Sequence, residues 1–97
     1  MTKITLEDID TIYGLIMDRD FEAAHEKVKP FMNKADPSFM LLAKYIPVSL
    51  SATMSIWQET GNHELASEFL LENFARGLNT DLEIDAACKS IIAQELN

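Results

Sequence analysis

The side chains that could do chemistry in this sequence are two histidines and one cysteine. His25 and His63 both have glutamates close by in the sequence, and Cys88 is the only cysteine among the 97 residues. No His-Glu-x-x-His pattern is present, and a single cysteine cannot supply a cysteine-rich zinc site. Carboxylates beside histidines at helix starts are typical of surface pairs. We therefore expect no metal site and no cofactor.

Nucleophilic catalysis and nucleotide chemistry also lack their usual patterns. Hydroxyl side chains alternate from Ser49 to Ser55, and a helix scatters residues at that spacing over several faces. Neither the glycine elbow of hydrolases nor a glycine-rich phosphate loop occurs. The sequence therefore predicts that the protein is not an enzyme.

His25 supports an alternative function, the transfer of a phosphoryl group. The segment from Asp20 to Phe31 resembles the phosphoacceptor helix of histidine-phosphotransfer domains, which are acidic helical bundles of similar size. That family has a lysine three residues after the histidine and a small residue after the lysine, whereas this sequence has Val28 and Lys29. The resemblance implies His25 as the phosphoacceptor, and we keep it as the alternative to a binding function.

The overall charge limits the kinds of partner. Sixteen acidic residues against eight lysines and arginines give a formal net charge of −8. A protein of that charge is repelled by the phosphates of nucleic acids and by anionic membrane surfaces. We expect neither nucleic acid nor a membrane as a partner, and predict instead another protein with a basic or neutral surface. A homodimer is the other assembly that we keep open.

Composition and sequence pattern predict one small helical domain. The sequence is 47% apolar and 25% charged, as in ordinary globular proteins, with only three glycines and three prolines. Apolar residues recur at helical spacing, and the alternation of a strand is almost absent. A chain of this length has room for one core. We therefore predict a single domain over residues 1–97, with an all-α fold in a compact antiparallel bundle of four to six helices.

Capping residues mark the predicted helix boundaries. Five residues can cap helix N-termini, namely Thr5, Asp20, Asp36, Asn62 and Thr80. Gly61 and Gly77 are the predicted helix stops. Pro47 lacks the amide that would donate to the carbonyl of Ala43, so the helix that begins after Asp36 either ends near Tyr45 or bends there.

The last two predicted helices each carry a buried apolar stripe. The stripe after Asn62 is expected to contain Leu65, Phe69, Leu70 and Phe74. The stripe after Thr80 is expected to contain Ile84, Ala87, Ile91 and Ile92, with Cys88 beside it.

The stretch from Pro47 to Gly77 resembles the helical cap modules that accompany cobalamin-binding domains, such as that of methionine synthase. In this family a proline-led helix ends with tryptophan and glycine, as Trp57 and Gly61 stand here, and the next helix carries a Val-Ala-x-Glu-His signature. Three residues match that signature in order, namely Leu65, Ala66 and Glu68.

The resemblance implies a helical cap architecture over about Ile12 to Leu78. Phe69 stands where the family has its histidine, and the Rossmann-like domain that holds the corrin from below has no counterpart here. We therefore expect a cap-like regulatory module with no bound cobalamin, and keep a cobalamin-sensing cap as a further alternative.

Trp57 is the centre of the predicted binding surface. It is the only tryptophan, and the segment 51–97 around it carries a net charge of −6, against −5 for residues 1–26 and +3 for residues 27–50. We predict that acidic residues form a rim around Trp57, namely Glu64, Glu68, Glu72, Asp81, Glu83 and Asp85. Phe69 completes the set of predicted partner or ligand contacts. A central aromatic residue with charges at the rim is typical of protein-binding surfaces.

The sequence also predicts a cytoplasmic location. No apolar run approaches the roughly 18 to 20 residues of a membrane span, and Met1 to Thr11 lacks the pattern of a secretory signal. A single cysteine, Cys88, agrees with a reducing compartment.

Overall fold

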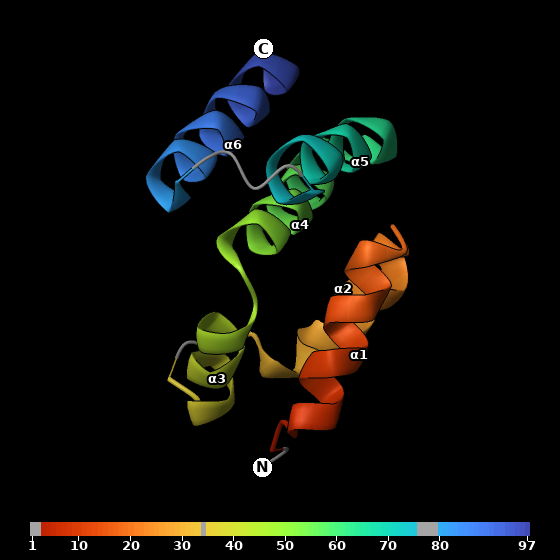
Figure 1. The fold of residues 1–97 in the computed structure, drawn as a ribbon, viewed down its shortest axis with the longest axis vertical. Coiled ribbons are helices and arrows are strands. Elements are labelled where there is room, and N and C mark those ends of the chain that lie inside the picture. Colours follow the sequence, from red (N-terminus) through yellow and green to blue (C-terminus); the bar gives the residue numbers. More distant parts are fainter. Residues whose placement is uncertain (1–2, 34, 76–79) are drawn as a thin grey trace. The chain divides into compact units, whose positions relative to one another are not determined.

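The computed structural model describes residues 3–33, 35–75 and 80–97, and within these ranges the chain is helical without any strand (Figure 1). The described helices are α1 (Leu6–Met17), α2 (Phe21–Val28), the 3₁₀ turn η1 (Lys29–Phe31), α3 (Pro37–Tyr45), α4 (Val48–Thr60), α5 (His63–Leu70), the π-helical turn η2 (Leu71–Ala75) and α6 (Asp81–Leu96). The predicted all-α fold is confirmed. The predicted helix stop at Gly77 lies outside the described residues.

The chain divides into two compact units, Met1–Pro47 and Val48–Asn97. Between them α3 ends at Tyr45, Ile46 is extended with φ −92° and ψ 117°, and α4 begins at Val48. Of the two alternatives for Pro47, the helix therefore ends, because proline has no amide to donate one turn back. That the two units form a single domain stays a prediction.

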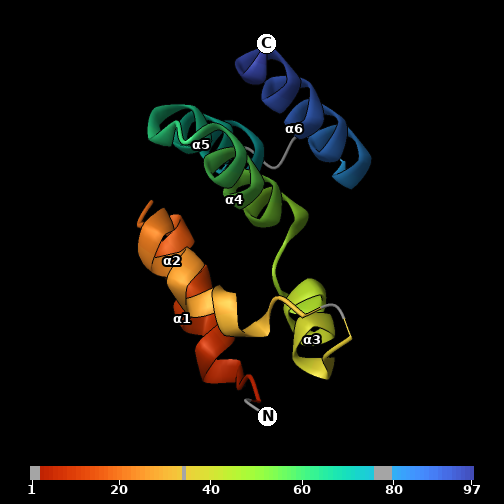
Figure 2. The same ribbon diagram turned by 180° about the vertical axis from the view of Figure 1, so that it is seen from behind.

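In the first unit, α1 and α2 pack against each other (Figures 1 and 2). Thr5 caps α1 as predicted and forms a capping box with Asp8, since the Asp8 amide donates to Thr5 Oγ1 at 3.1 Å and the Thr5 amide donates to Asp8 Oδ2 at 3.0 Å. Asp20 caps α2 by accepting from the Ala23 amide at 3.3 Å. The buried apolar residues of this unit are Ile4, Ile9, Ile12, Ile16, Phe21, Ala24, Phe31, Leu42 and Ile46.

Two hydrogen bonds that involve Ser38 hold the start of α3. The Ser38 amide donates to Asp36 Oδ1 at 2.8 Å, so Asp36 is the predicted N-cap. The buried Ser38 hydroxyl in turn accepts from the amide of Ile4 at 3.1 Å. This bond ties the start of α3 to the segment that leads into α1. It also satisfies a buried amide that would otherwise cost free energy.

In the second unit, α4 packs against both α5 and α6. Its buried side includes Leu50, Thr53 and Ile56, none of which has measurable exposure, and Thr53 Oγ1 donates to the Ser49 carbonyl at 2.7 Å. Gly61 ends α4 in the left-handed conformation predicted for it, with φ 68°.

Both remaining helices of this unit begin at their predicted caps. Asn62 Oδ1 accepts from the Leu65 amide at 3.0 Å, and Thr80 and Glu83 form a capping box at the start of α6. Helix α6 buries Ile84 and Cys88, whereas Ala87, Ile91 and Ile92 are only half-buried. The predicted stripe was therefore partly wrong. Residues 84 and 88 lie one turn apart on the side that meets α4, where the Cys88 thiol donates to the Ala52 carbonyl at 3.5 Å.

The turn between α1 and α2 holds a side chain in the left-handed region. Arg19 has φ 61°, its amide donates to the Ile16 carbonyl at 3.0 Å, and the Asp20 amide donates to the Leu15 carbonyl at 2.9 Å. This is the Schellman arrangement that usually has glycine at the Arg19 position.

Replacing Arg19 by glycine should therefore raise the free energy of unfolding by roughly 0.5 to 1 kcal/mol. The left-handed conformation costs a residue other than glycine about 1 to 2 kcal/mol, and the substitution removes that cost. Two effects reduce the gain in stability: the larger conformational entropy of glycine in the unfolded chain, and the loss of the interactions of the Arg19 side chain. Urea unfolding followed by circular dichroism measures the change. A Glu22→Gly control inside α2 should destabilise by about 1 kcal/mol, and a destabilised Arg19→Gly variant would contradict the strain.

Within the described part of the chain, no single helix is long and apolar enough to cross a membrane, although α3 and α4 together meet the length and composition criterion.

Candidate functional site

Trp57, the predicted centre of a binding surface, lies on α4 one turn before its end. The Gly61 amide donates to the Trp57 carbonyl at 2.9 Å, which closes the last turn of the helix. The Trp57 side chain is half-buried and interacts with the rest of the protein. Part of its surface is therefore packed, and part is accessible to a partner.

Three of the predicted rim acids form a stripe along α5 and the start of η2. Glu64, Glu68 and Glu72 are all exposed and are spaced by four residues, so they follow roughly one side of the helix. The opposite side is buried by Ala66 and Leu70. No described basic residue forms an ion pair with these three glutamates. Like charges four residues apart destabilise an α-helix by about 0.2 to 0.5 kcal/mol per pair, whereas Glu64 also lies in the first turn of α5, where a negative charge favours the helix. We call these three residues the acidic stripe.

The other predicted rim acids, on α6, have local roles. Glu83 Oε1 accepts from the Thr80 hydroxyl at 2.9 Å within the capping box, and Asp85 forms an ion pair with Lys89 at 3.0 Å. Asp81 lies in the first turn of α6, where a negative charge favours the helix. These three carboxylates therefore have local roles inside α6, as Glu64 has in the first turn of α5, whereas Glu68 and Glu72 form no ion pair with a described basic residue.

Phe69 lies inside the second unit rather than on its surface. Its side chain is 3% exposed, on the same buried side of α5 as Ala66 and Leu70. At this position Phe69 anchors the helix that carries the acidic stripe. Its direct contact with a partner or ligand stays a prediction, and that contact would require the ring to become accessible.

Neither histidine belongs to a group of side chains that could hold a metal ion, as far as the described residues show. His25 is half-buried on α2 and interacts within the protein, and His63 is exposed at the start of α5, with Nδ1 3.5 Å from the Ser67 hydroxyl. Among the described residues, no group of three or more histidines, cysteines or carboxylates is placed to hold a metal ion. The role of His25 as a phosphoacceptor stays a prediction.

The first unit contains an open pocket of about 550 Å³ that the sequence pattern did not predict. Its lining residues come from α1 and from the last residue of α3, namely Leu6, Glu7, Ile9, Asp10, Tyr13 and Tyr45. The last two are the only tyrosines of the chain. The spacing of Glu7, Asp10 and Tyr13 by three residues places them on neighbouring positions of α1, and this was the available sequence signal. We call this the tyrosine pocket.

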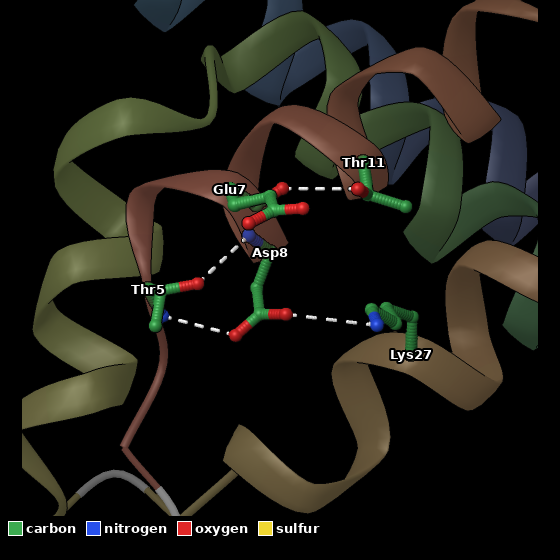
Figure 3. A network of polar contacts seen from close by, with 5 residues as sticks. All are labelled: Thr5, Glu7, Asp8, Thr11 and Lys27. Carbon is green, nitrogen blue, oxygen red and sulfur yellow. Dashed lines mark hydrogen bonds and ion pairs between the residues drawn. The ribbon is translucent and has the colours of Figure 1, made fainter.

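The carboxylate between the two pocket acids has other partners. Figure 3 shows Asp8 directed towards Thr5 and Lys27, with Lys27 Nζ 3.6 Å from Asp8 Oδ1. The hydrogen bonds from Thr5, with a smaller contribution from Lys27, hold the pKa of Asp8 below its ordinary value of 3.8. Neither Glu7 nor Asp10 forms an ion pair with a described basic residue. Lys27 therefore pairs with Asp8 and not with either acid that lines the pocket.

Cys88 should react slowly with thiol reagents. It is buried, and burial together with the nearby charge of Asp85 raises the pKa of its thiol. The reactive thiolate is therefore scarcer at neutral pH than in a free cysteine. Labelling by Ellman's reagent at pH 7.5 should be slower than that of glutathione by a factor of about ten or more. Equally fast labelling in the native protein, with full reactivity restored in urea as the control, would contradict the packing of α6 on α4.

No protein-family model, curated protein or solved structure matches this sequence.

Proposed function

We propose that this chain is a non-enzymatic protein-binding module, acting as an adaptor, inhibitor or chaperone-like regulator of a partner with a basic or neutral surface. The observation that carries the proposal is the acidic stripe, because Glu64, Glu68 and Glu72 are all exposed and none forms an ion pair with a described basic residue. The resemblance to cobalamin caps contributes only a helical architecture of a kind used in regulatory modules.

The second unit combines the two contributions that such binding requires. The half-buried Trp57 offers aromatic surface on a helix that packs against α5, and burial of tryptophan at an interface slows dissociation. The acidic stripe attracts a basic surface over distance and so raises the rate of association. The proposed partner therefore meets α4 and α5, with Trp57 supplying affinity and the glutamates supplying the encounter rate.

The experiment compares the wild type with two sets of variants as baits against cell extract, followed by kinetics on the partner that mass spectrometry identifies. One set is Trp57→Ala and the stripe triple Glu64→Gln, Glu68→Gln and Glu72→Gln. The control triple has the same charge change on exposed acids of the first unit, namely Asp18→Asn, Glu22→Gln and Glu26→Gln.

We expect the control triple to bind like the wild type, apart from a small uniform effect of net charge. Trp57→Ala should weaken the complex by about 2 kcal/mol, chiefly through faster dissociation. The stripe triple should lower the association rate and its dependence on salt. A complex that responds equally to both triples, or is indifferent to Trp57, would refute the proposed surface.

One assay distinguishes the alternative function, phosphotransfer through His25, from the proposed binding function. Incubation with a phosphorylated receiver domain would label His25 in a phosphotransfer protein, and His25→Gln would abolish the label. On the proposed binding function, both proteins stay unlabelled.

A further inference from the structure

We propose that the tyrosine pocket binds an arginine side chain of a partner polypeptide. The site lies wholly in the first unit and shares no residue with the surface proposed above, so the two can succeed or fail separately. Its volume of about 550 Å³ lies within the usual range of about 300 to 1,000 Å³ for ligand pockets.

The pocket walls have the mixed chemistry that an arginine requires. Ile9 and Leu6 supply apolar surface for the aliphatic stem of the side chain, and Leu6 is 68% exposed and leaves this wall open to an incoming chain. Tyr45, which is 46% exposed, supplies an aromatic ring on which a planar guanidinium stacks, and Tyr13, which also interacts within the protein, lines the same pocket. Long cationic side chains commonly bind in this way, with the stem on apolar surface and the charged group near acids.

The charges around the pocket favour a cation. Glu7 and Asp10 both line it, and neither forms an ion pair with a described basic residue. Lys27 on α2 forms its ion pair with Asp8, at 3.6 Å, and Asp8 is not among the residues that line the pocket. Two carboxylates at one wall can accept the several N–H donors of a guanidinium, which a small ammonium group satisfies less well.

Lys44 places a positive charge beside the Tyr45 ring, and this charge opposes the proposed ligand. Its Nζ lies over that ring at 5.4 Å from the centroid, yet Lys44 is not among the residues that line the pocket. The positive charge of Lys44 lowers the attraction of the pocket for a second cation. Removal of that charge should therefore strengthen arginine binding, which a purely apolar pocket would not do.

The test uses three short peptides with the sequence Ac-Ala-Leu-X-Leu-Ala-amide, in which X is arginine, lysine or citrulline. Citrulline keeps the planar shape of arginine without its charge. Each peptide is titrated into the ¹⁵N-labelled full chain, and amide shifts are followed by NMR. We expect saturable shifts on Leu6–Tyr13 and at Tyr45 with the arginine peptide, weaker binding of the lysine peptide, and no saturation with citrulline.

Variants then separate the pocket from general charge attraction. The pair Glu7→Gln and Asp10→Asn should weaken arginine-peptide binding by about tenfold, and Tyr45→Leu by about three- to fivefold. The control pair Asp18→Asn and Glu22→Gln carries the same charge change away from the pocket and should have little effect. Lys44→Gln should tighten binding by about twofold or more. Circular dichroism melting confirms that each variant is folded.

Three outcomes would overturn the proposal. The first is equal shifts with the arginine and citrulline peptides, which would mean that the charge is not recognised. The second is an equal loss of binding in both pairs of charge variants. The third is a set of shifts centred on the acidic stripe instead of the pocket, which would place basic-peptide binding on the second unit and leave that separate proposal standing.

Discussion

Replacing Phe69 by alanine should lower the free energy of unfolding by about 3 to 5 kcal/mol. The ring is 3% exposed on the buried side of α5, so the change removes apolar contacts and leaves a cavity. A loss of this size is a large fraction of the roughly 5 to 15 kcal/mol that stabilises a typical small protein. Urea unfolding followed by circular dichroism measures it directly.

Leu71, two residues further along, provides the control. Its side chain is 48% exposed, so Leu71→Ala should change the free energy of unfolding by less than about 1 kcal/mol. A similarly small effect of Phe69→Ala would show that the Phe69 ring lies in an accessible groove. That result would support its predicted role as a direct ligand or partner contact and would contradict its burial in the structure.

The helix starts could be predicted because the interactions that define them are local. The caps at Thr5, Asp36, Asn62 and Thr80 each join a side chain to an amide two or three residues along the chain. Such bonds need no knowledge of the rest of the fold. The same holds for Gly61, whose left-handed conformation ends α4.

Features that depend on packing were harder to predict. The left-handed Arg19 gives no glycine signal, and the π-helical turn Leu71–Ala75 has no distinctive spacing. In that turn the buried Asn73 side chain donates to the Phe69 carbonyl at 3.1 Å. In α6, helical periodicity alone could not decide which of its neighbouring apolar positions meets α4, so Ile91 and Ile92 were assigned to the buried stripe.

Of the two candidate sites, one could be predicted from local sequence and the other could not. The four-residue spacing of Glu64, Glu68 and Glu72 is visible in the sequence and predicts exposed neighbours, although Glu72 lies beyond α5 in η2. The tyrosine pocket was not predictable, because Tyr13 and Tyr45 are far apart in the sequence and share a pocket only through the path of the chain. The hydrogen bond from the Ile4 amide to Ser38 spans 34 positions and joins the same two parts of the chain.

Phe21→Ala should have an effect as large as that of Phe69→Ala, but in the first unit. Phe21 is 1% exposed and is among the largest fully buried side chains, so its truncation should cost about 3 to 5 kcal/mol. It is also the first residue of α2, which has only eight residues. Isolated helices shorter than about 12 residues are marginal in water, so α2 depends on this anchor against α1.

The Phe21 variant should therefore lose helix as well as stability. Hydrogen exchange of the α2 amides should accelerate far more than that of α4, and the circular dichroism signal at 222 nm should fall before global unfolding. Glu22→Ala, at the exposed next position, should leave both measurements near the wild type. If α2 kept its protection in Phe21→Ala, the cap at Asp20 and the helix's own residues would be enough to hold it.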